Sequence, residues 1–165
     1  MSFQEMKESL VNAYDRNVQV IRMKQLINDG HAIIGDVPGK LRIPVLSGPT
    51  GIGKTACVKD FVSEKKFELI ELDCSYMPSS ALATFMPSAT NRIRAGEING
   101  CVLLIDNVNE ADNEWLELFD QYANNYFDAL VNIAYGKNED CIRKIRQRVD
   151  DLPEGLFIVG EQRPV

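Results

Sequence analysis

The stretch that decides the fold is a glycine-rich segment of eight residues that follows a short apolar run. It reads Gly48-Pro49-Thr50-Gly51-Ile52-Gly53-Lys54-Thr55 and matches the pattern G-x-x-x-x-G-K-[ST] at every fixed position. The run before it predicts a strand and the residues after it predict a helix, which is the context that this motif requires. The glycines let successive backbone N–H groups point inward as an anion nest, and the start of the helix adds its positive dipole end. The segment therefore predicts a phosphate-binding loop.

The residue types in this loop suggest a nucleotide with a divalent cation. We expect Lys54 to reach the β- and γ-phosphates and the Thr55 hydroxyl to sit on Mg²⁺. All eight loop residues, together with Ala56 after them, are predicted to contact the nucleotide. The alternative is a glycine-rich turn with an incidental lysine. At average residue usage, such a match arises by chance in roughly one in a few hundred chains of this length.

A second candidate site follows another apolar run. Residues Cys101–Ile105 read CVLLI and are followed by Asp106. A continuous apolar run of this length is typical of a strand that is covered on both faces. An aspartate at the carboxyl end of such a strand faces the ligand crevice, so we expect Asp106 to hold Mg²⁺ together with Thr55. The alternative is a helix N-cap aspartate after a buried strand.

The pattern along the chain predicts an α/β protein. We expect a three-layer αβα core with a mostly parallel sheet, because strands alternate with helices. An N-terminal helical segment (residues 1–30) is predicted to pack on a core formed by residues 31–165. The expected helices are 3–28, 54–65, 78–95, 113–135 and 139–149, and the expected strands are 41–47, 67–74, 101–105 and 156–160.

Composition excludes several classes of protein. The chain has 165 residues with a net charge of −6, and 45% of them are hydrophobic and 25% charged, so it is neither disordered nor fibrous. It lacks an apolar run of about 18 residues and begins without a signal-peptide pattern, so we expect a cytoplasmic protein that does not enter a membrane. The acidic balance does not indicate direct nucleic-acid binding. The basic run 143–148 is expected to be a solvated helix face, or alternatively a patch that faces phosphates or nucleic acid.

The metal-ligating residue types do not form a zinc motif. His31 is the only histidine and is expected in a surface loop, and no pair of cysteines has C-x-x-C spacing. The four cysteines are expected to be reduced structural residues, and three of them to pack as small hydrophobes. They are Cys57, Cys74, Cys101 and Cys141, of which the first three lie in or beside apolar runs.

Two stretches resemble one family. Residues 103–111, LLIDNVNEA, look like the second nucleotide motif of AAA+ ATPases, and most like the MoxR-like pattern L-L-x-D-E-I-N-R-A. Residues 156–164, LFIVGEQRP, look like the strand and sensor 1 of that branch, commonly x-x-A-T-x-N-P. The resemblance implies an ATPase that uses ATP and Mg²⁺. It also implies a protein partner or homo-oligomer, and work on a protein or nucleic-acid assembly.

The chain departs from the family pattern at several positions. The family's catalytic glutamate falls at Asn107, its sensor 1 asparagine at Arg163, and the arginine of N-R-A at Glu110. An asparagine can orient water but cannot take its proton, so we expect Lys54, Asp106 and Asn107 to form a catalytic set of reduced activity. Glu110 is a substitute base or, in the favoured reading, a helix-start residue. The chain ends after the sensor 1 strand, so we expect no C-terminal helical lid and assign no arginine finger or sensor 2.

Three functions remain in competition. The first is an active AAA+ ATPase that remodels a partner, and the second is a nucleotide-binding switch that hydrolyses slowly or only with a partner. The third is a small P-loop kinase that transfers the γ-phosphate of ATP to a small molecule. In the kinase, Glu71 and Asp73 would bind the acceptor and the basic run 143–148 would form the lid.

Overall fold

A four-stranded parallel sheet forms the centre of the protein. The computed structural model describes residues 2–28, 40–49, 51–124 and 152–163. The strands lie in the order β1 (Val45–Ser47), β4 (Leu156–Gln162), β3 (Cys101–Asp106) and β2 (Glu68–Asp73). Every neighbouring pair is parallel, so the predicted α/β class is confirmed.

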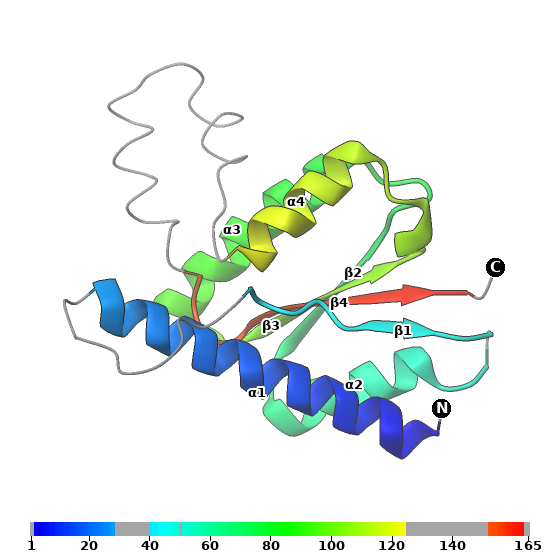
Figure 1. Cartoon of the computed structure of the whole chain (residues 1–165), viewed down its shortest axis with the longest axis horizontal. Coiled ribbons are helices and arrows are strands. Elements are labelled where there is room, and N and C mark those ends of the chain that lie inside the picture. Colours follow the sequence, from blue (N-terminus) through cyan, green and yellow to red (C-terminus); the bar gives the residue numbers. More distant parts are fainter. Residues whose placement is uncertain (1, 29–39, 50, 125–151, 164–165) are drawn as a thin grey trace.

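Helices cover both faces of the sheet. In Figure 1, α1 and α2 lie below the sheet and α3 and α4 lie above it. A single turn of 3₁₀ helix, η1, follows β3. The helices are α1 (Phe3–Asn28), α2 (Lys54–Lys65), α3 (Ser80–Arg94) and α4 (Asn113–Ala123), and η1 spans Val108–Glu110.

Strand β3 shows why the sheet is buried on both sides. Its first five residues are at most 2% exposed. Because side chains alternate along a strand, Val102 and Leu104 pack with α1 and α2, while Cys101, Leu103 and Ile105 pack with α3 and α4. The predicted strand with two covered faces is confirmed.

The N-terminal helix is one continuous element. It packs against α2 and the sheet through Tyr14, whose ring centroid lies 5.6 Å from that of Phe61 and 5.3 Å from that of Phe157. Near its other end, Val20 and Ile21 belong to the core on the α3 and α4 side. Residues of α1 thus contribute to both cores, and the division at residue 30 stays a prediction.

Several element bounds differ from the sequence predictions, and β4 runs two residues beyond the predicted end at 160. The strand expected at 41–47 is regular only from Val45, because Pro44 has no N–H for the ladder and offers only its carbonyl, which accepts from Gly160 N. The segment 78–95 is a helix from Ser80 and continues through Pro87.

Other predictions are confirmed or fall outside the described residues. Cys57, Cys74 and Cys101 are buried, free thiols, as expected. The predicted helix 113–135 is described up to Ala123. The helix 139–149, the basic run 143–148, His31 and Cys141 lie outside the described residues. None of the described helices is long and apolar enough to cross a membrane.

Candidate nucleotide-binding site

The carboxyl ends of the strands meet at one edge of the sheet. Asp73 is in register with Asp106 on the neighbouring strand, and β4 continues to pair Glu161 with Leu46 of β1. In Figure 1 this edge lies beside the start of α2 and the C-terminal end of the chain. Parallel strands place their carboxyl-end loops together, and this is where α/β proteins bind ligands.

The glycine-rich loop joins β1 to α2 at this edge. Gly53 is the N-cap residue of α2 and has φ 91°, a left-handed conformation in which a side chain would be strained. No side chain caps this helix end. The free N–H groups of the first turn of α2 therefore remain available to an anion.

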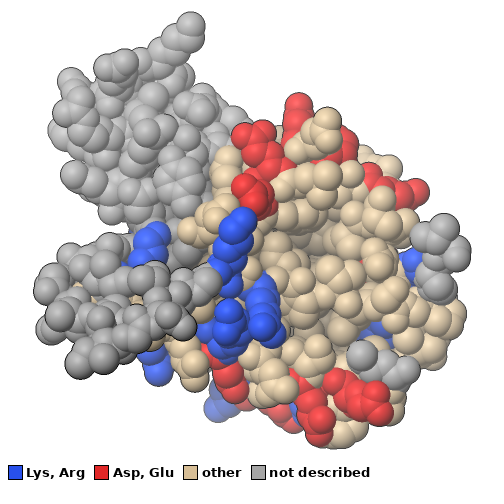
Figure 2. Space-filling model, in the orientation of Figure 1, with Lys and Arg blue, Asp and Glu red and all other residues tan. Residues whose placement is uncertain are grey.

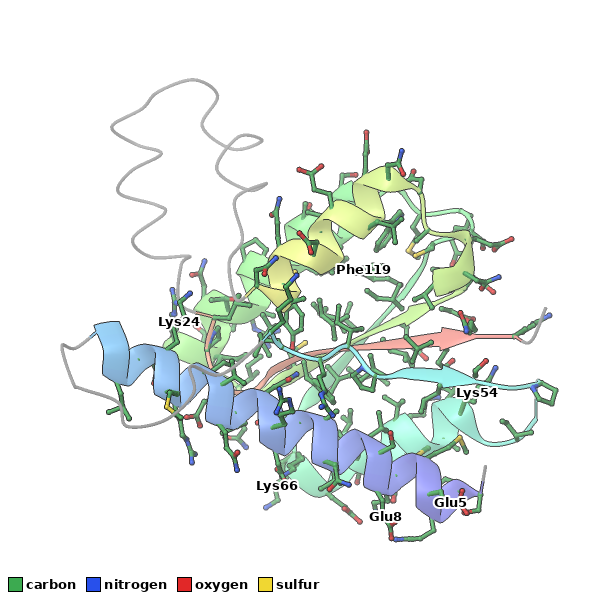
Figure 3. The ribbon with its side chains drawn as sticks, viewed as in Figure 1. Glu5, Glu8, Lys24, Lys54, Lys66 and Phe119 are labelled. Carbon is green, nitrogen blue, oxygen red and sulfur yellow. The ribbon has the colours of Figure 1, made fainter. Side chains whose placement is uncertain are left out.

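Lys54 is the first residue of α2 and is only 8% exposed. Its Nζ donates hydrogen bonds to the carbonyl oxygens of Gly48 and, at 3.0 Å, Gln162. Figure 3 shows Lys54 at the edge of the sheet where α2 begins. Two neutral carbonyls hold the ammonium in place without balancing its charge, and a nearly buried positive charge favours an anionic ligand.

A pocket of about 270 Å³ opens beside this ammonium. Its lining combines the loop, the start of α2 and the ends of β3 and β4. The lining residues are Gly51, Gly53, Lys54, Thr55, Ala56, Asp106, Glu161 and Arg163. The structure thus brings Lys54, Thr55 and Asp106 to one cavity.

The other predicted loop residues stand apart from this lining. Gly48 meets Lys54 through its carbonyl group. Ile52 is half-buried and packs against the core on the α1 and α2 side. Pro49 is exposed and is not among the described residues that line the pocket, and Thr50 lies outside the described residues.

Asn107 is turned away from the loop. It adopts φ 55°, and its Nδ2 donates to both carboxylate oxygens of Asp73, at 3.0 and 3.1 Å. Its backbone N–H donates to the Asp106 carboxylate at 2.8 Å. Among the described residues that line this pocket and the one beside it, Asn107 does not appear. Its amide is therefore engaged in holding Asp73.

The contact with Asn107 helps to lower the pKa of the Asp73 carboxyl. Burial by itself would raise its pKa, but hydrogen bonds from Asn107 and Ser75 outweigh that effect and hold the pKa below its ordinary value. Asp73 therefore stays ionised at neutral pH and favours an Asn107 amide that points toward it.

Glu161 is the functional candidate that sequence reasoning missed. It lies near the end of β4, is 4% exposed, and both its carboxylate oxygens lie 3.1 Å from the donating Thr55 hydroxyl. Burial raises the pKa of this carboxyl, and the Thr55 hydroxyl opposes the shift. The signal was present in the sequence, since Glu161 follows an apolar strand as Asp106 does.

A smaller cavity, of about 150 Å³, adjoins the first. The two share Thr55, Asp106 and Glu161. The smaller cavity adds Glu71, Leu72, Asp73, Tyr76 and Leu104. The acidic pair Glu71 and Asp73, expected in a kinase to hold the phosphate acceptor, thus lines a cavity that adjoins the pocket of the phosphate loop.

The residues present fit a cation that is shared with phosphates. Thr55 and Asp106 both line the pocket, and a hydroxyl and a carboxylate supply oxygen ligands of the kind that Mg²⁺ prefers. No three His, Cys, Asp or Glu side chains of the described segments come together as a metal cage of their own. Mg²⁺ is often held by one or two carboxylates plus substrate phosphates, so this donor set suits it.

Two further positions can be placed. Arg163, the expected sensor 1 position, is exposed and lines the larger pocket. Glu110 is exposed at the end of η1 and lines neither pocket among the described residues. The start of α4 is instead capped by Asp112, whose side chain accepts from the Trp115 N–H, and both roles considered for Glu110 stay predictions.

The surface seen in Figure 2 carries both signs of charge. Acidic side chains gather over α4 and along the N-terminal part of α1, with basic ones between. The acidic residues of α4 are the exposed Glu114, Glu117 and Asp120. Among the described residues seen in this view, acidic side chains flank the basic ones, so these residues form no continuous basic face for a nucleic-acid backbone.

The chain was compared with known proteins. Residues 44–155 match the family described as the ATPase family associated with various cellular activities (AAA). The matched range begins just before β1, contains the phosphate loop and Asp106, and ends just before β4. The comparison with curated proteins found no match.

Proposed function

Because the chain belongs to the AAA family of ATPases, we propose that it binds ATP with Mg²⁺ at the loop 48–55 and hydrolyses it slowly or only with a partner. The observation that carries this proposal is the nearly buried Lys54 ammonium, which lies at one pocket with Thr55 and Asp106. In this proposal the chain remodels or regulates a protein or nucleic-acid assembly in the cytoplasm, as a homo-oligomer or with a protein partner. The sequence LLIDNVNEA supports the MoxR-like branch.

In this proposal, different residues bind the phosphates and the cation. The loop N–H groups and Lys54 bind the phosphates, and Thr55 and Asp106 hold Mg²⁺. Once bound, Mg²⁺ supplies neutralisation of the phosphate charge. Positioning and electrostatics provide most of the rate in phosphoryl transfer, so this set supports some turnover without a strong base.

The position of Asn107 supports slow hydrolysis. An amide cannot accept the proton of an attacking water, and this amide already donates to Asp73 on both oxygens. General bases contribute about 10²–10⁴-fold in rate where they act, so their absence leaves binding intact and turnover low.

The release of phosphate from ATP distinguishes an active ATPase from a nucleotide-binding switch. We expect the wild type to release phosphate from ATP slowly and Lys54→Ala to release none. Asn107→Glu is expected to raise turnover, with Asn107→Gln as the control that has the longer side chain without a carboxylate. Wild-type turnover already at the level of Asn107→Glu would support the autonomous motor, and binding without release would support the switch.

The small kinase remains the second candidate because of the smaller pocket. Glu71 and Asp73 line a cavity that shares Thr55, Asp106 and Glu161 with the phosphate pocket. Transfer of the γ-phosphate to a nucleoside or small acid, lost in Glu71→Gln, would favour the kinase. Release of free phosphate alone would favour the ATPase.

A further inference from the structure

The carboxylate that contacts Thr55 in this structure is Glu161 of β4. The Thr55 hydroxyl donates to Glu161, and the Asp106 carboxylate accepts instead from the backbone N–H of Asn107. The sequence pattern predicts that Thr55 and Asp106 share the cation. The structure adds a second carboxylate, on another strand, to the same wall of the pocket.

The Glu161 carboxylate has no salt-bridge partner among the described residues, and the Lys54 ammonium acts on its charge only through space. Glu161 is 96% buried, since 4% of it is exposed. The nearest loop cation, Lys54, donates its hydrogen bonds to two backbone carbonyls. A buried carboxylate that has only a hydroxyl as partner favours a cation beside it.

The direction of the hydrogen bond from Thr55 to Glu161 determines what the Thr55 oxygen can bind on its other side. The hydroxyl of Thr55 has one proton and two lone pairs. Because the proton is directed to Glu161, the lone pairs are free for a cation on the other side of the oxygen. Glu161 thus orients Thr55 as a cation ligand and places a negative charge next to it.

We propose that Glu161 is a positioning residue that makes nucleotide binding depend on Mg²⁺. The inference rests on the proposed nucleotide function and adds a residue to it. With Mg²⁺ present, Glu161 directs the Thr55 lone pairs to the cation and its charge favours that cation. Without Mg²⁺, the same charge repels the phosphates, because like charges a few ångströms apart at a partly buried site interact strongly.

The test is the affinity for N-methylanthraniloyl-ADP, measured by fluorescence once with saturating Mg²⁺ and once with EDTA. The dissociation constant in EDTA divided by the one with Mg²⁺ reports how strongly the cation favours nucleotide binding. In Glu161→Gln, which keeps an acceptor for Thr55 but removes the charge, we expect this ratio to fall about ten-fold, within the usual range of coupling between two ligands. Glu161→Asp, which keeps the charge, should retain most of the wild-type ratio.

Glu117→Gln is the matched control, since it removes one exposed carboxylate from α4, and its ratio should equal that of the wild type. A structural defect would weaken binding equally with Mg²⁺ and with EDTA, so the ratio separates positioning from folding. If the wild type binds the nucleotide and Glu161→Gln keeps the wild-type ratio, the role of Glu161 is refuted while the proposed function stands. If the wild type binds no nucleotide in either buffer, both are refuted.

Discussion

The contact between Asn107 and Asp73 gives the sharpest prediction about stability. In Asn107→Ala the amide that donates to both oxygens of Asp73 is lost. A hydrogen bond to a charged group contributes about 1.5–3 kcal/mol, and both residues are only half-buried, so we take the lower end. Alanine at the observed φ of 55° adds about 1 kcal/mol of strain. The sum predicts a loss of about 2.5 kcal/mol.

Urea unfolding followed by circular dichroism measures this loss directly. For a domain of this size, 1 kcal/mol shifts the melting temperature by about 2–4 °C, so the variant should melt roughly 5–10 °C lower. The two parts of the loss differ in their pH dependence. The strain at residue 107 is independent of pH, whereas the hydrogen-bond part requires an ionised Asp73.

The sign of the pH dependence follows from the lowered pKa of Asp73. A carboxyl whose folded pKa is below its unfolded value stabilises the protein above that unfolded value, here 3.8, and loses this contribution as the pH falls through the folded pKa. The difference between wild type and Asn107→Ala should therefore be constant from pH 7 to about pH 5 and shrink below pH 4. A difference that is under about 0.5 kcal/mol at pH 7, or unchanged at pH 3, would refute the reasoning.

Three further predictions concern the core. In a Cys141→Ser background the remaining thiols should resist Ellman's reagent at pH 8 until the protein unfolds, because burial raises their pKa, and fast labelling of the native protein would contradict this. Gly155→Ala should lower the free energy of unfolding by about 1–3 kcal/mol in urea, since a Cβ at φ 95° would lie 2.7 Å from the Asn99 carbonyl oxygen; unchanged stability would contradict that strain. Tyr122→Phe should lower it by about 1–2 kcal/mol because the buried hydroxyl donates to the Leu156 carbonyl oxygen at 3.2 Å, and a neutral result would mean that the bond is not formed. The thiols are those of Cys57, Cys74, where the pKa is raised to about 12, and Cys101, where it is raised to about 11.

Much of the fold could be predicted because its signals are local. The loop 48–55 fixes a strand, a turn and a helix in one stretch, and α2 has the predicted bounds. The apolar run of β3 could be assigned to the middle of a sheet because no polar residue interrupts it. The predicted strand 41–47 is longer than the observed β1 because Pro44 cannot donate to a ladder, and this limit is visible in the sequence itself.

The candidate site was harder to predict because it depends on register between distant strands. Asp73 and Asp106 are paired across β2 and β3, and this register brings Asn107 to Asp73. No local sequence pattern predicts that pairing. The extension of β4 beyond Gly160 brings Glu161 to Thr55 in the same way. A charged residue at the end of a buried strand is visible in sequence, but the partner it meets is set by the sheet.

The central claim is that the pocket beside Lys54 binds the phosphates of ATP with Mg²⁺. Isothermal titration calorimetry of ATP into the wild type and into Lys54→Ala, both with Mg²⁺, tests it most directly. We predict binding to the wild type and a loss of about ten-fold or more in the variant, since one charged hydrogen-bonding group contributes about 1.5–3 kcal/mol. Equal affinity of the two proteins, or no heat of binding with the wild type, would contradict the claim.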